Sequence, residues 1–287
     1  MASPVQKIAA CPHCLRQVVY WFSKNSYHLY RCSCGLGFVH PLPNPSEVYS
    51  TDYFSGAHEG FGYADYDRDK EVMVPTFREY IRRIKVLKPT GCLLDIGAAT
   101  GFFLNIARME GFQIEGVEIS MFAAERAREK GIVMHTGTLE TFRSIKQFDV
   151  ITMLDLLEHV TDPQALLKRA RDMMGAGGVL IINTPDFRSW YARMLGKGWH
   201  LIVPPEHLYY YTRPVLREML DRADFEIVEM TTIGKKFTLP YIFTTLYKWL
   251  GLSIFASLSH MTERGVFARI GIPINLYDNV FIIARAK

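Results

Sequence analysis

The stretch that decides the fold is Cys92-Leu-Leu-Asp-Ile-Gly-Ala-Ala-Thr-Gly-Phe-Phe-Leu104. A short apolar run reaches Asp95, a glycine-containing turn follows, and an amphipathic segment begins at Phe102 with no proline to stop it. This pattern predicts strand, tight turn and helix, the first unit of a doubly wound α/β sheet. Gly97 and Gly101 would let the backbone pass close to a ligand, and the helix points its free N–H groups at the same place.

The dinucleotide-binding fingerprint G-x-G-x-x-G would need glycines at three positions that are Gly97, Ala99 and Phe102 in this chain. Two of the three glycines are missing, so the turn disfavours a pyrophosphate ligand and, with it, a nicotinamide oxidoreductase. The carboxylate of Asp95, directly before the turn, suits a ligand with a cationic amine better than one with phosphates.

This arrangement resembles motif I of the class I S-adenosylmethionine-dependent methyltransferases, D/E-x-G-x-G-x-G. Asp95, Gly97 and Gly101 match the motif, and Ala99 stands where its middle glycine is expected. One methyl group narrows such a turn without removing its shape. The resemblance implies S-adenosylmethionine as the cofactor, with these four residues around it.

The composition is that of an ordinary globular protein, because 49% of the 287 residues are hydrophobic and 22% are charged. The net charge of +4 is small and scattered, so nucleic acid is not expected as a partner. The first seven residues contain no apolar segment of the kind that a secretion signal needs, and the five cysteines are not spread as a disulfide framework. We therefore expect a cytoplasmic protein.

Four of the cysteines form two close pairs, Cys11-Pro-His-Cys14 and Cys32-Ser-Cys34, separated by seventeen residues. β-Branched and aromatic residues between the pairs predict a small hairpin, and the whole is the ligand layout of a zinc ribbon. Four protein ligands leave no open position for chemistry, so the zinc would be structural. Because the second pair is the tighter Cys-x-Cys, His13 or His40 could replace a ligand. Buried or redox-active thiols are the alternative.

From residue 91 onward, predicted strands and helices alternate regularly. The run 148–154 is apolar almost throughout, as expected for a strand buried on both faces. Seven strands, with a late pair that can lie antiparallel, form the Rossmann-like methyltransferase sheet that the resemblance implies for residues 75–287. The predicted strands are 93–96, 113–118, 132–135, 148–154, 178–183, 225–232 and 278–284, and the predicted helices are 71–87, 102–110, 121–130, 163–174 and 213–223.

The predicted organisation has three parts. A zinc-ribbon module spans 1–45, and a linker, lid and leading helix span 46–90. The methyltransferase domain spans 91–287, with insertions at 186–212 and 234–277. The lid would be the aromatic, glycine-rich stretch that includes Tyr63 and Tyr66.

The resemblance assigns further cofactor contacts. Glu118 ends the second predicted strand, where relatives carry an acidic residue whose two oxygens accept hydrogen bonds from the ribose hydroxyls. Thr138 and Leu139 match the positions that hold the adenine ring, although many relatives have Asp in place of Thr138. Leu154 and Asp155 end the fourth strand and are expected near the sulfonium and the acceptor.

The segment Asp155-Leu-Leu-Glu158-His159-Val160 resembles a signature of this branch of methyltransferases. In ubiquinone-type O-methyltransferases the matching acidic residue, Glu and His form a divalent-metal site, and Asp155, Glu158 and His159 have the same ligand types at the same spacing. The alternative is a helix cap with satisfied polar contacts.

A second motif, Glu206-His207-Leu-Tyr-Tyr-Tyr-Thr212, resembles the E-H-L-x-x-[FY]-[ST] segment of sugar and small-molecule methyltransferases. A histidine with a pKa near neutrality can take the proton from an acceptor hydroxyl, so His207 is the candidate general base. Glu206 would orient it or bind the acceptor, and Asp155 and a tyrosine of the lid would assist. Alternatively, Glu206 and His207 only pin the loop to the following helix, which Thr212 would cap.

The insertion 234–277 contains a mostly apolar stretch, 237–258, broken by Pro240 and Gly251. A helical hairpin that covers the site or lies in a membrane interface is expected there, rather than a membrane span. With the hairpin in a membrane interface, the protein would be peripheral at the inner face of a membrane. A buried or dimer-forming helix pair is the alternative.

The sequence thus predicts an S-adenosylmethionine-dependent methyltransferase with a zinc ribbon, similar to the sugar C-methyltransferases and to bacterial glycan and small-molecule methyltransferases. Its acceptor would be a small molecule, a sugar or a lipid-linked compound. A metal-dependent ubiquinone-type O-methyltransferase and a non-catalytic zinc-binding adaptor are the alternatives.

Overall fold

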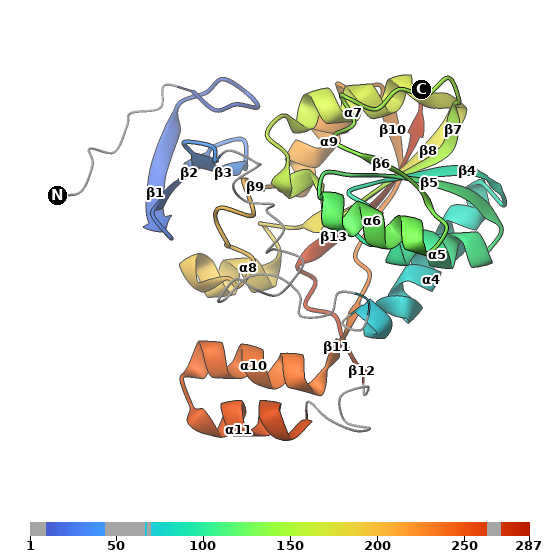
Figure 1. Cartoon of the computed structure of the whole chain (residues 1–287). Helices are drawn as coiled ribbons and strands as arrows, with labels where there is room; N and C mark the ends of the chain where they lie inside the picture. The colour runs from blue at the N-terminus through green and yellow to red at the C-terminus, as the bar shows by residue number, and fades with distance from the viewer. Residues whose placement is uncertain (1–9, 44–66, 68–69, 263–270) are drawn as a thin grey trace.

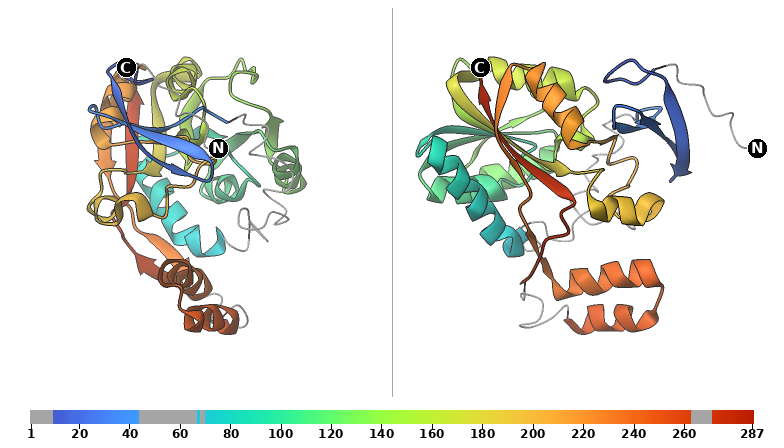
Figure 2. Two further views of the ribbon diagram at one scale, coloured as in Figure 1. Left: turned by 90° about the vertical axis from the view of Figure 1, so that its left-hand side faces the viewer. Right: turned by 180° about the vertical axis from the view of Figure 1, so that it is seen from behind.

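The computed structural model describes residues 10–43, 67, 70–262 and 271–287 of the chain. A seven-stranded sheet with helices on both faces makes up the main body (Figure 1). A small sheet that follows the cysteines lies at one side of this body, and a pair of helices projects from it (Figure 2). The lid predicted for 49–66 falls outside the described residues.

The main sheet has the strand order β10-β13-β8-β7-β4-β5-β6. β13 runs antiparallel to both of its neighbours, and the other pairs are parallel. The prediction of a seven-stranded Rossmann-like sheet with a late antiparallel strand is therefore confirmed. The strands are β4 (Gly91–Ile96), β5 (Phe112–Glu118), β6 (Val133–Thr136), β7 (Phe148–Leu154), β8 (Met174–Pro185), β10 (Phe225–Thr231) and β13 (Asn279–Ala286).

Alternate residues of the central strands pack into two separate cores. Ile151 of β7 belongs to one core and Val150 to the other, which explains why this strand is apolar almost throughout. Side chains of α4, α5 and α6 enter one core, and those of α7 and α9 enter the other. These helices are α4 (Val74–Leu87, after the 3₁₀ turn η1, Glu71–Met73), α5 (Phe102–Met109), α6 (Met121–Glu129), α7 (Pro163–Asp172) and α9 (Arg213–Asp221).

Local sequence explains the starts of two of these helices. Asp162 precedes α7, and its Oδ1 accepts a hydrogen bond from Ala165 N at 2.9 Å, while Pro163 fits the first helical position. Ser120 caps α6 in the same way, at 3.4 Å from Ala123 N. Thr212 is the N-cap residue of α9, as one of the alternatives expects, but its side chain makes no capping hydrogen bond.

The small sheet has the order β1-β2-β3-β9, all antiparallel. The predicted hairpin is present as β1 (Val18–Lys24) and β2 (Tyr27–Cys32), and β3 (Gly37–His40) extends it. β9 (Tyr209–Tyr210) comes from the insertion at 186–212, so the insertion completes the sheet of the N-terminal segment. The same insertion contains α8 (Trp190–Leu195) and the 3₁₀ turn η3 (Gly196–Gly198), and a further turn, η2 (Leu157–His159), follows β7.

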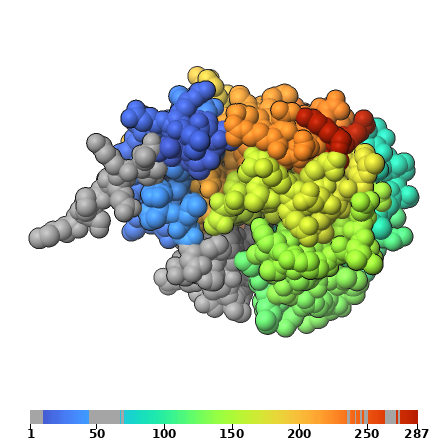
Figure 3. Space-filling model, turned by 90° about the horizontal axis from the view of Figure 1, so that it is seen from above, coloured from blue at the N-terminus to red at the C-terminus, as the bar shows by residue number. Residues whose placement is uncertain are grey.

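The N-terminal segment also shares a core with the main body. Cys11, Tyr30 and Phe38 lie in the same cluster of buried residues as the strands of the large sheet. At the surface, His13 Nε2 lies 2.9 Å from Glu218 Oε2 of α9, and the two parts form a continuous surface in the view from above (Figure 3). The module boundary at residue 45 stays a prediction, but the described residues before it pack in cores that they share with the main body and the insertion.

The helical hairpin expected for 234–277 is present. β11 (Lys235–Thr238) pairs with β12 (Gly271–Ile274), and between them α10 (Leu239–Leu250) packs on α11 (Ser253–Thr262). Thr244 Oγ1 and Ser259 Oγ lie 2.8 Å apart across the two helices. Among the described residues, no helix combines the length and the apolar character that crossing a membrane requires.

Candidate active site

Two buried carboxylates mark the carboxyl ends of the neighbouring strands β4 and β5. Asp95 is 4% exposed and Glu118 is 5% exposed. Thr152 on β7 donates its hydroxyl to Asp95 Oδ1 at 2.6 Å. Burial and, to a smaller extent, the nearby Glu118 raise the pKa of Asp95 to about 7, although the hydrogen bond from Thr152 acts in the opposite direction. A cationic ligand at this edge of the sheet would favour the ionised form of Asp95.

The turn after β4 has the left-handed backbone that its glycines permit. Gly97 and Gly101 have φ of 74° and 73°, and Ala99 has φ of 47°. Alanine in this region costs roughly 1–2 kcal/mol. Ala99 N donates to Glu118 Oε2 at 2.8 Å, and this charge-assisted bond offsets part of the cost.

Gly101 has a second reason to lack a side chain. A Cβ there would lie 2.4 Å from Ile132 Cδ1 and 3.2 Å from Ala127 Cβ. The glycine therefore allows α5 to pack closely against its neighbours. The prediction explained Gly101 by the approach of a ligand alone, and the structure adds this packing requirement.

Glu118 holds the site together with both carboxylate oxygens. Besides the bond from Ala99, Oε1 accepts from Ser120 N at 2.8 Å. Burial raises the pKa of Glu118, while the backbone N–H donors act in the opposite direction. Each carboxylate oxygen has a second lone pair, so the predicted acceptance of two ribose hydroxyls remains compatible with these bonds.

The predicted adenine residues follow β6. Leu139 is 1% exposed and packs in the core, so its side chain cannot cover the face of an adenine ring. Its backbone groups remain as candidates for contact with the adenine. Thr138 is half-buried, and its N–H and C=O both bond the Thr141 hydroxyl. Leu154, half-buried at the end of β7, is placed as predicted at the same edge of the sheet.

Asp67 was not singled out by the sequence, but it connects the segment before α4 to the glycine turn. The Thr100 hydroxyl donates to Asp67 Oδ1 at 2.5 Å, and Lys130 Nζ forms an ion pair with Asp67 Oδ2. Lys130 Nζ also donates to Thr100 O at 2.9 Å. These contacts hold Asp67 beside the turn. A lone Asp and a lone Lys carry no local pattern that would have revealed them.

Asp155 is exposed at the end of β7 and has a positive φ of 53°. Such a strained backbone is frequent at functional sites. Its N–H donates to Asn183 O at 2.8 Å, and its Oδ1 accepts from Asn183 Nδ2. Asn279 Nδ2 in turn donates to Asn183 Oδ1 at 3.3 Å. Asp155 is thus held in one orientation by a chain of amides on β8 and β13.

Tyr80 of α4 contributes a second feature that the sequence did not reveal. Its ring stacks on Phe281 with centroids 4.6 Å apart, and its hydroxyl is buried with no hydrogen-bond partner among the residues that the structure describes. Burial and the nearby Asp155 raise its pKa. Buried hydroxyls usually have a hydrogen-bond partner, so the Tyr80 hydroxyl is a candidate to form a hydrogen bond with the molecule that receives the methyl group. The sequence pattern indicated only a core position on the helix.

The loop that carries the Glu-His motif lies against η2. Leu208 N donates to Glu158 O at 2.8 Å, and His159 Nδ1 donates to Glu206 O at 2.9 Å. The Tyr211 hydroxyl donates to Leu157 O at the start of η2, and the Tyr209 hydroxyl donates to Thr161 O just after it. The motif therefore anchors its loop, as expected from the alternative in which Glu206 and His207 only pin the loop. It also brings these two residues beside the end of β7.

Burial makes both histidines of this loop and turn weak bases. His207 Nδ1 donates to Leu201 O at 2.7 Å, and its ring meets that of His159 edge-on with centroids 4.7 Å apart. Burial, with neighbouring His159, lowers the pKa of His207 to about 3. The expectation of a near-neutral pKa for His207 is therefore wrong, because it took no account of desolvation.

Glu206 has the opposite property. Burial raises the pKa of its carboxyl to about 7, and no hydrogen bond or ion pair joins this carboxyl to any residue within the described part of the chain. Catalytic bases work best with a pKa near the working pH. Of the predicted catalytic residues, Glu206 has the environment that best suits proton transfer.

The predicted metal ligands are only partly brought together. Ligand atoms of Glu158, His159 and His207 lie within 4.8 Å of one another, and Asp155 is not part of this group. Backbone carbonyls accept from Nδ1 of both rings, which directs the two Nε2 atoms as acceptors. Glu158 Oε2 accepts from the Thr184 hydroxyl at 2.8 Å.

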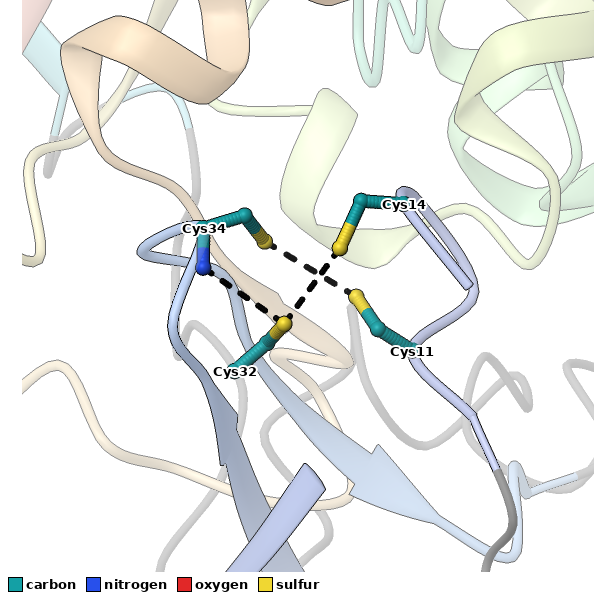
Figure 4. Close-up of side chains that lie close together, drawn as sticks. All are labelled: Cys11, Cys14, Cys32 and Cys34. Atoms are coloured by element: carbon teal, nitrogen blue, oxygen red, sulfur yellow. Dashed lines mark hydrogen bonds between the residues drawn. The ribbon is translucent and has the colours of Figure 1, made fainter. Parts of the chain in front are cut away.

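The four N-terminal cysteines converge on one point (Figure 4). All four Sγ atoms lie within 4.8 Å of one another, with Cys11 and Cys34 at 3.8 Å and Cys14 and Cys32 at 3.4 Å. A tetrahedron of thiolates around zinc has sulfurs about 3.8 Å apart, from Zn–S bonds of about 2.3 Å. The predicted four-cysteine cluster is confirmed, and His13 instead binds Glu218.

Comparison with known proteins identifies the family. A model of the methyltransferase domain matches residues 67–230. The ubiquinone biosynthesis O-methyltransferase of Histophilus somni (strain 2336) is 28% identical over 153 residues, and the match covers 48% of this chain and 64% of that protein. The corresponding protein of Citrobacter koseri is 28% identical over 149 residues, covering 44% and 62%.

Solved structures show the same fold. One is a methyltransferase from Thermotoga maritima described as a possible histamine N-methyltransferase, with a TM-score of 0.52, 23% identity and coverage of 77% of this chain and 94% of that one. Another is magnesium protoporphyrin IX methyltransferase from Synechocystis, with a TM-score of 0.54, 14% identity and coverage of 85% and 100%. The chain belongs to the methyltransferase domain family and has its seven-stranded α/β fold.

Proposed function

We propose that this protein transfers a methyl group from S-adenosylmethionine to a small-molecule acceptor, with sugars and lipid-linked compounds as the expected classes. The observation that carries the proposal is the pair of buried carboxylates, Asp95 and Glu118, on either side of a left-handed glycine turn. The family match over 67–230 supports it. Gly97, Ala99 and Gly101 would surround the donor together with Thr138, Leu139 and Leu154.

When bound, the donor supplies an electrophilic methyl group on a sulfonium. The protein must align an acceptor atom with it and manage the acceptor proton. Glu206 is the proposed base, because its carboxyl is buried, carries no ion pair within the described chain and adjoins His207. Neutral His207, Asp155 and Tyr80 would position the acceptor.

Calorimetry tests the donor site. S-adenosylhomocysteine should bind wild-type protein in the micromolar range, roughly 7–9 kcal/mol. Glu118→Ala should weaken binding by about 1–3 kcal/mol, because charge-assisted bonds and the support of the Ala99 turn are lost. Glu125→Ala, an exposed glutamate on α6, is the matched control and should bind normally. If the wild-type protein bound neither S-adenosylmethionine nor S-adenosylhomocysteine, the alternative of a non-catalytic zinc-binding adaptor would be favoured.

We further propose that the four-cysteine cluster holds a structural zinc ion. The sulfur separations support this assignment, and Cys11 and Cys32 are buried in a core shared with the methyltransferase sheet. Elemental analysis should find about one zinc per chain. Cys32→Ser should release it and lower the melting temperature, whereas Cys92→Ser, which lies outside the cluster, should retain it. Zinc-free protein of unchanged stability would contradict the assignment.

A metal-dependent O-methyltransferase is the second candidate, and the grouping of Glu158, His159 and His207 favours it. The ubiquinone biosynthesis relatives are consistent with O-methylation. A weak chelator should then abolish methyl transfer while the zinc content is unchanged, and Mg²⁺ or Mn²⁺ should restore it. Full activity in the chelator would leave these residues with a structural role.

Peripheral membrane contact through 237–258 stays a prediction. Leu252 and Ile254 at the turn of the hairpin are 53% and 61% exposed, which supports it. Flotation with anionic lipid vesicles would test it, and a Leu252→Asp variant should bind less if the prediction holds. A cytoplasmic location likewise stays a prediction.

A further inference from the structure

A pocket separate from the residues of the proposed active site lies between the small sheet and the insertion. Its volume is about 280 Å³, and it is lined by residues of β1, β2, α8 and η3 together with Phe187. Phe187 is two residues beyond the end of β8, so the pocket begins near the carboxyl edge of the main sheet. Figures 1 and 2 show α8 close to the small sheet.

The described residues that line this pocket include three cations and no acidic side chain. The cations are Arg31 of β2, Arg193 of α8 and Lys197 of η3, and all three are exposed. Within the described ranges, no hydrogen bond or ion pair joins any of these three to an anionic group. Arg213, by contrast, forms an ion pair with Asp186. Three like charges around one cavity repel one another, and a bound anion would offset that repulsion.

Arg31 is held in place by aromatic rings rather than by carboxylates. Its guanidinium carbon lies 3.2 Å from the centroid of Trp21 and 4.9 Å from that of Phe187. The β1–β2 register shifts between Tyr20 and Phe22, so Trp21 is the bulged residue, and bulges redirect side chains. A planar, stacked guanidinium is prepared for bidentate bonds to an oxyanion.

The charge of the pocket selects the class of anion. A carboxylate carries one negative charge, whereas a phosphate monoester or a diphosphate carries about two or more and offers several acceptor oxygens. Three donors that include two guanidinium groups match the second class better. The rings of Trp21 and Phe187 meet edge to face, with centroids 5.5 Å apart, and provide an apolar wall beside the charges.

We propose that this pocket binds a phosphate or diphosphate group of the methyl acceptor. The link to the acceptor rests on the proposed methyltransferase function, while the binding of the anion does not. The pocket would anchor the charged end of the acceptor, and the part to be methylated would extend toward Asp155 and Glu206. The acceptor is then a phosphorylated or diphosphate-linked compound.

Titration of the full-length protein with inorganic phosphate and pyrophosphate tests the proposal. Pyrophosphate should bind more tightly than phosphate and far more tightly than malonate. Arg193→Gln and Lys197→Gln, both at exposed positions that should fold normally, should each weaken pyrophosphate binding about tenfold. Arg31→Gln should weaken it at least as much. Arg217→Gln, an exposed arginine on α9 outside the pocket, is the matched control and should bind within twofold of wild type.

Each other outcome would count against the pocket. Wild-type protein that binds no pyrophosphate at millimolar concentration overturns the proposal, as does equal weakening by Arg217→Gln. Malonate binding as tightly as pyrophosphate overturns the assignment to phosphate. Zinc content is measured in every sample, because pyrophosphate can bind metals. S-adenosylhomocysteine is titrated in parallel, so loss of donor binding alone would refute the proposed function and leave the anion site standing.

Discussion

Replacing Asp95 by asparagine should make the protein more stable at pH 8 and, at the same time, weaken its affinity for S-adenosylmethionine by roughly 10–100-fold. The carboxyl is buried, and its pKa of about 7 stands above its ordinary value of 3.8. A pKa raised on folding means that the protonated form favours the folded state. The cost of ionisation grows as the pH rises from about 4 to about 7, and it is on the order of a few kcal/mol above that range. Asparagine carries no charge and avoids this cost.

The same substitution should harm binding because the cofactor is cationic. A hydrogen bond that involves a charged group contributes about 1.5–3 kcal/mol, which corresponds to the expected loss of affinity. The Thr152 hydroxyl can still donate to the amide oxygen of asparagine, so the local packing should survive. Wild-type affinity should also fall as the pH drops below about 7, by up to roughly tenfold per unit, because a proton must leave Asp95 before a cation binds.

Thermal unfolding at pH 8 and pH 5, without cofactor, measures the first effect, and calorimetry measures the second. Asp149→Asn is the matched control, because Asp149 lies near the opposite end of the same sheet and accepts from Cys92 N. It should leave affinity for the cofactor unchanged. An Asp95→Asn protein that is less stable than wild type at pH 8 would show that the carboxylate stabilises the fold. The raised pKa of Asp95 implies the opposite.

The residues that the sequence revealed are those with a local reason for their pattern. β7 was predicted with its observed bounds, because burial on both faces requires an apolar run. The turn at Gly97 was recognisable because a left-handed backbone requires glycine or a small residue. Likewise, the four cysteines had only to be brought together by one hairpin, and their spacing indicated a shared ligand.

The residues that the sequence did not reveal depend on contacts between distant parts of the chain. β9 pairs with β3 across about 170 residues, and two consecutive tyrosines show no alternation that would mark a strand. The bonds of Asp67 to Thr100 and Lys130 join three separate segments. The pKa of His207 was misjudged for the same reason, since it follows from the neighbours that enclose the ring.

The residues that enclose His207 lead to a different expectation for catalysis than the Glu-His motif alone. Two adjacent imidazoles with low pKa values are neutral at physiological pH and bind protons weakly. The Glu206 carboxyl lacks any ion pair to the described residues. We therefore expect Glu206 to remove the proton in the transition state. His207, whose Nδ1 donates to Leu201 O, would accept a hydrogen bond at Nε2 from a hydroxyl of the methyl acceptor.

Glu206→Gln should therefore lower the rate of methyl transfer by roughly 10²–10⁴-fold, the usual contribution of a general base, and leave S-adenosylhomocysteine affinity unchanged. The glutamine has nearly the same shape, so the backbone bond from His159 to Glu206 O should persist and the melting temperature should change little. His207→Gln should act mainly on acceptor binding, with a higher KM and a smaller change in kcat. The acceptor is first found by incubating metabolite extracts with methyl-labelled donor, and single-turnover rates are then compared for the two variants. A large loss of rate in His207→Gln beside a nearly normal Glu206→Gln would return the role of base to the histidine.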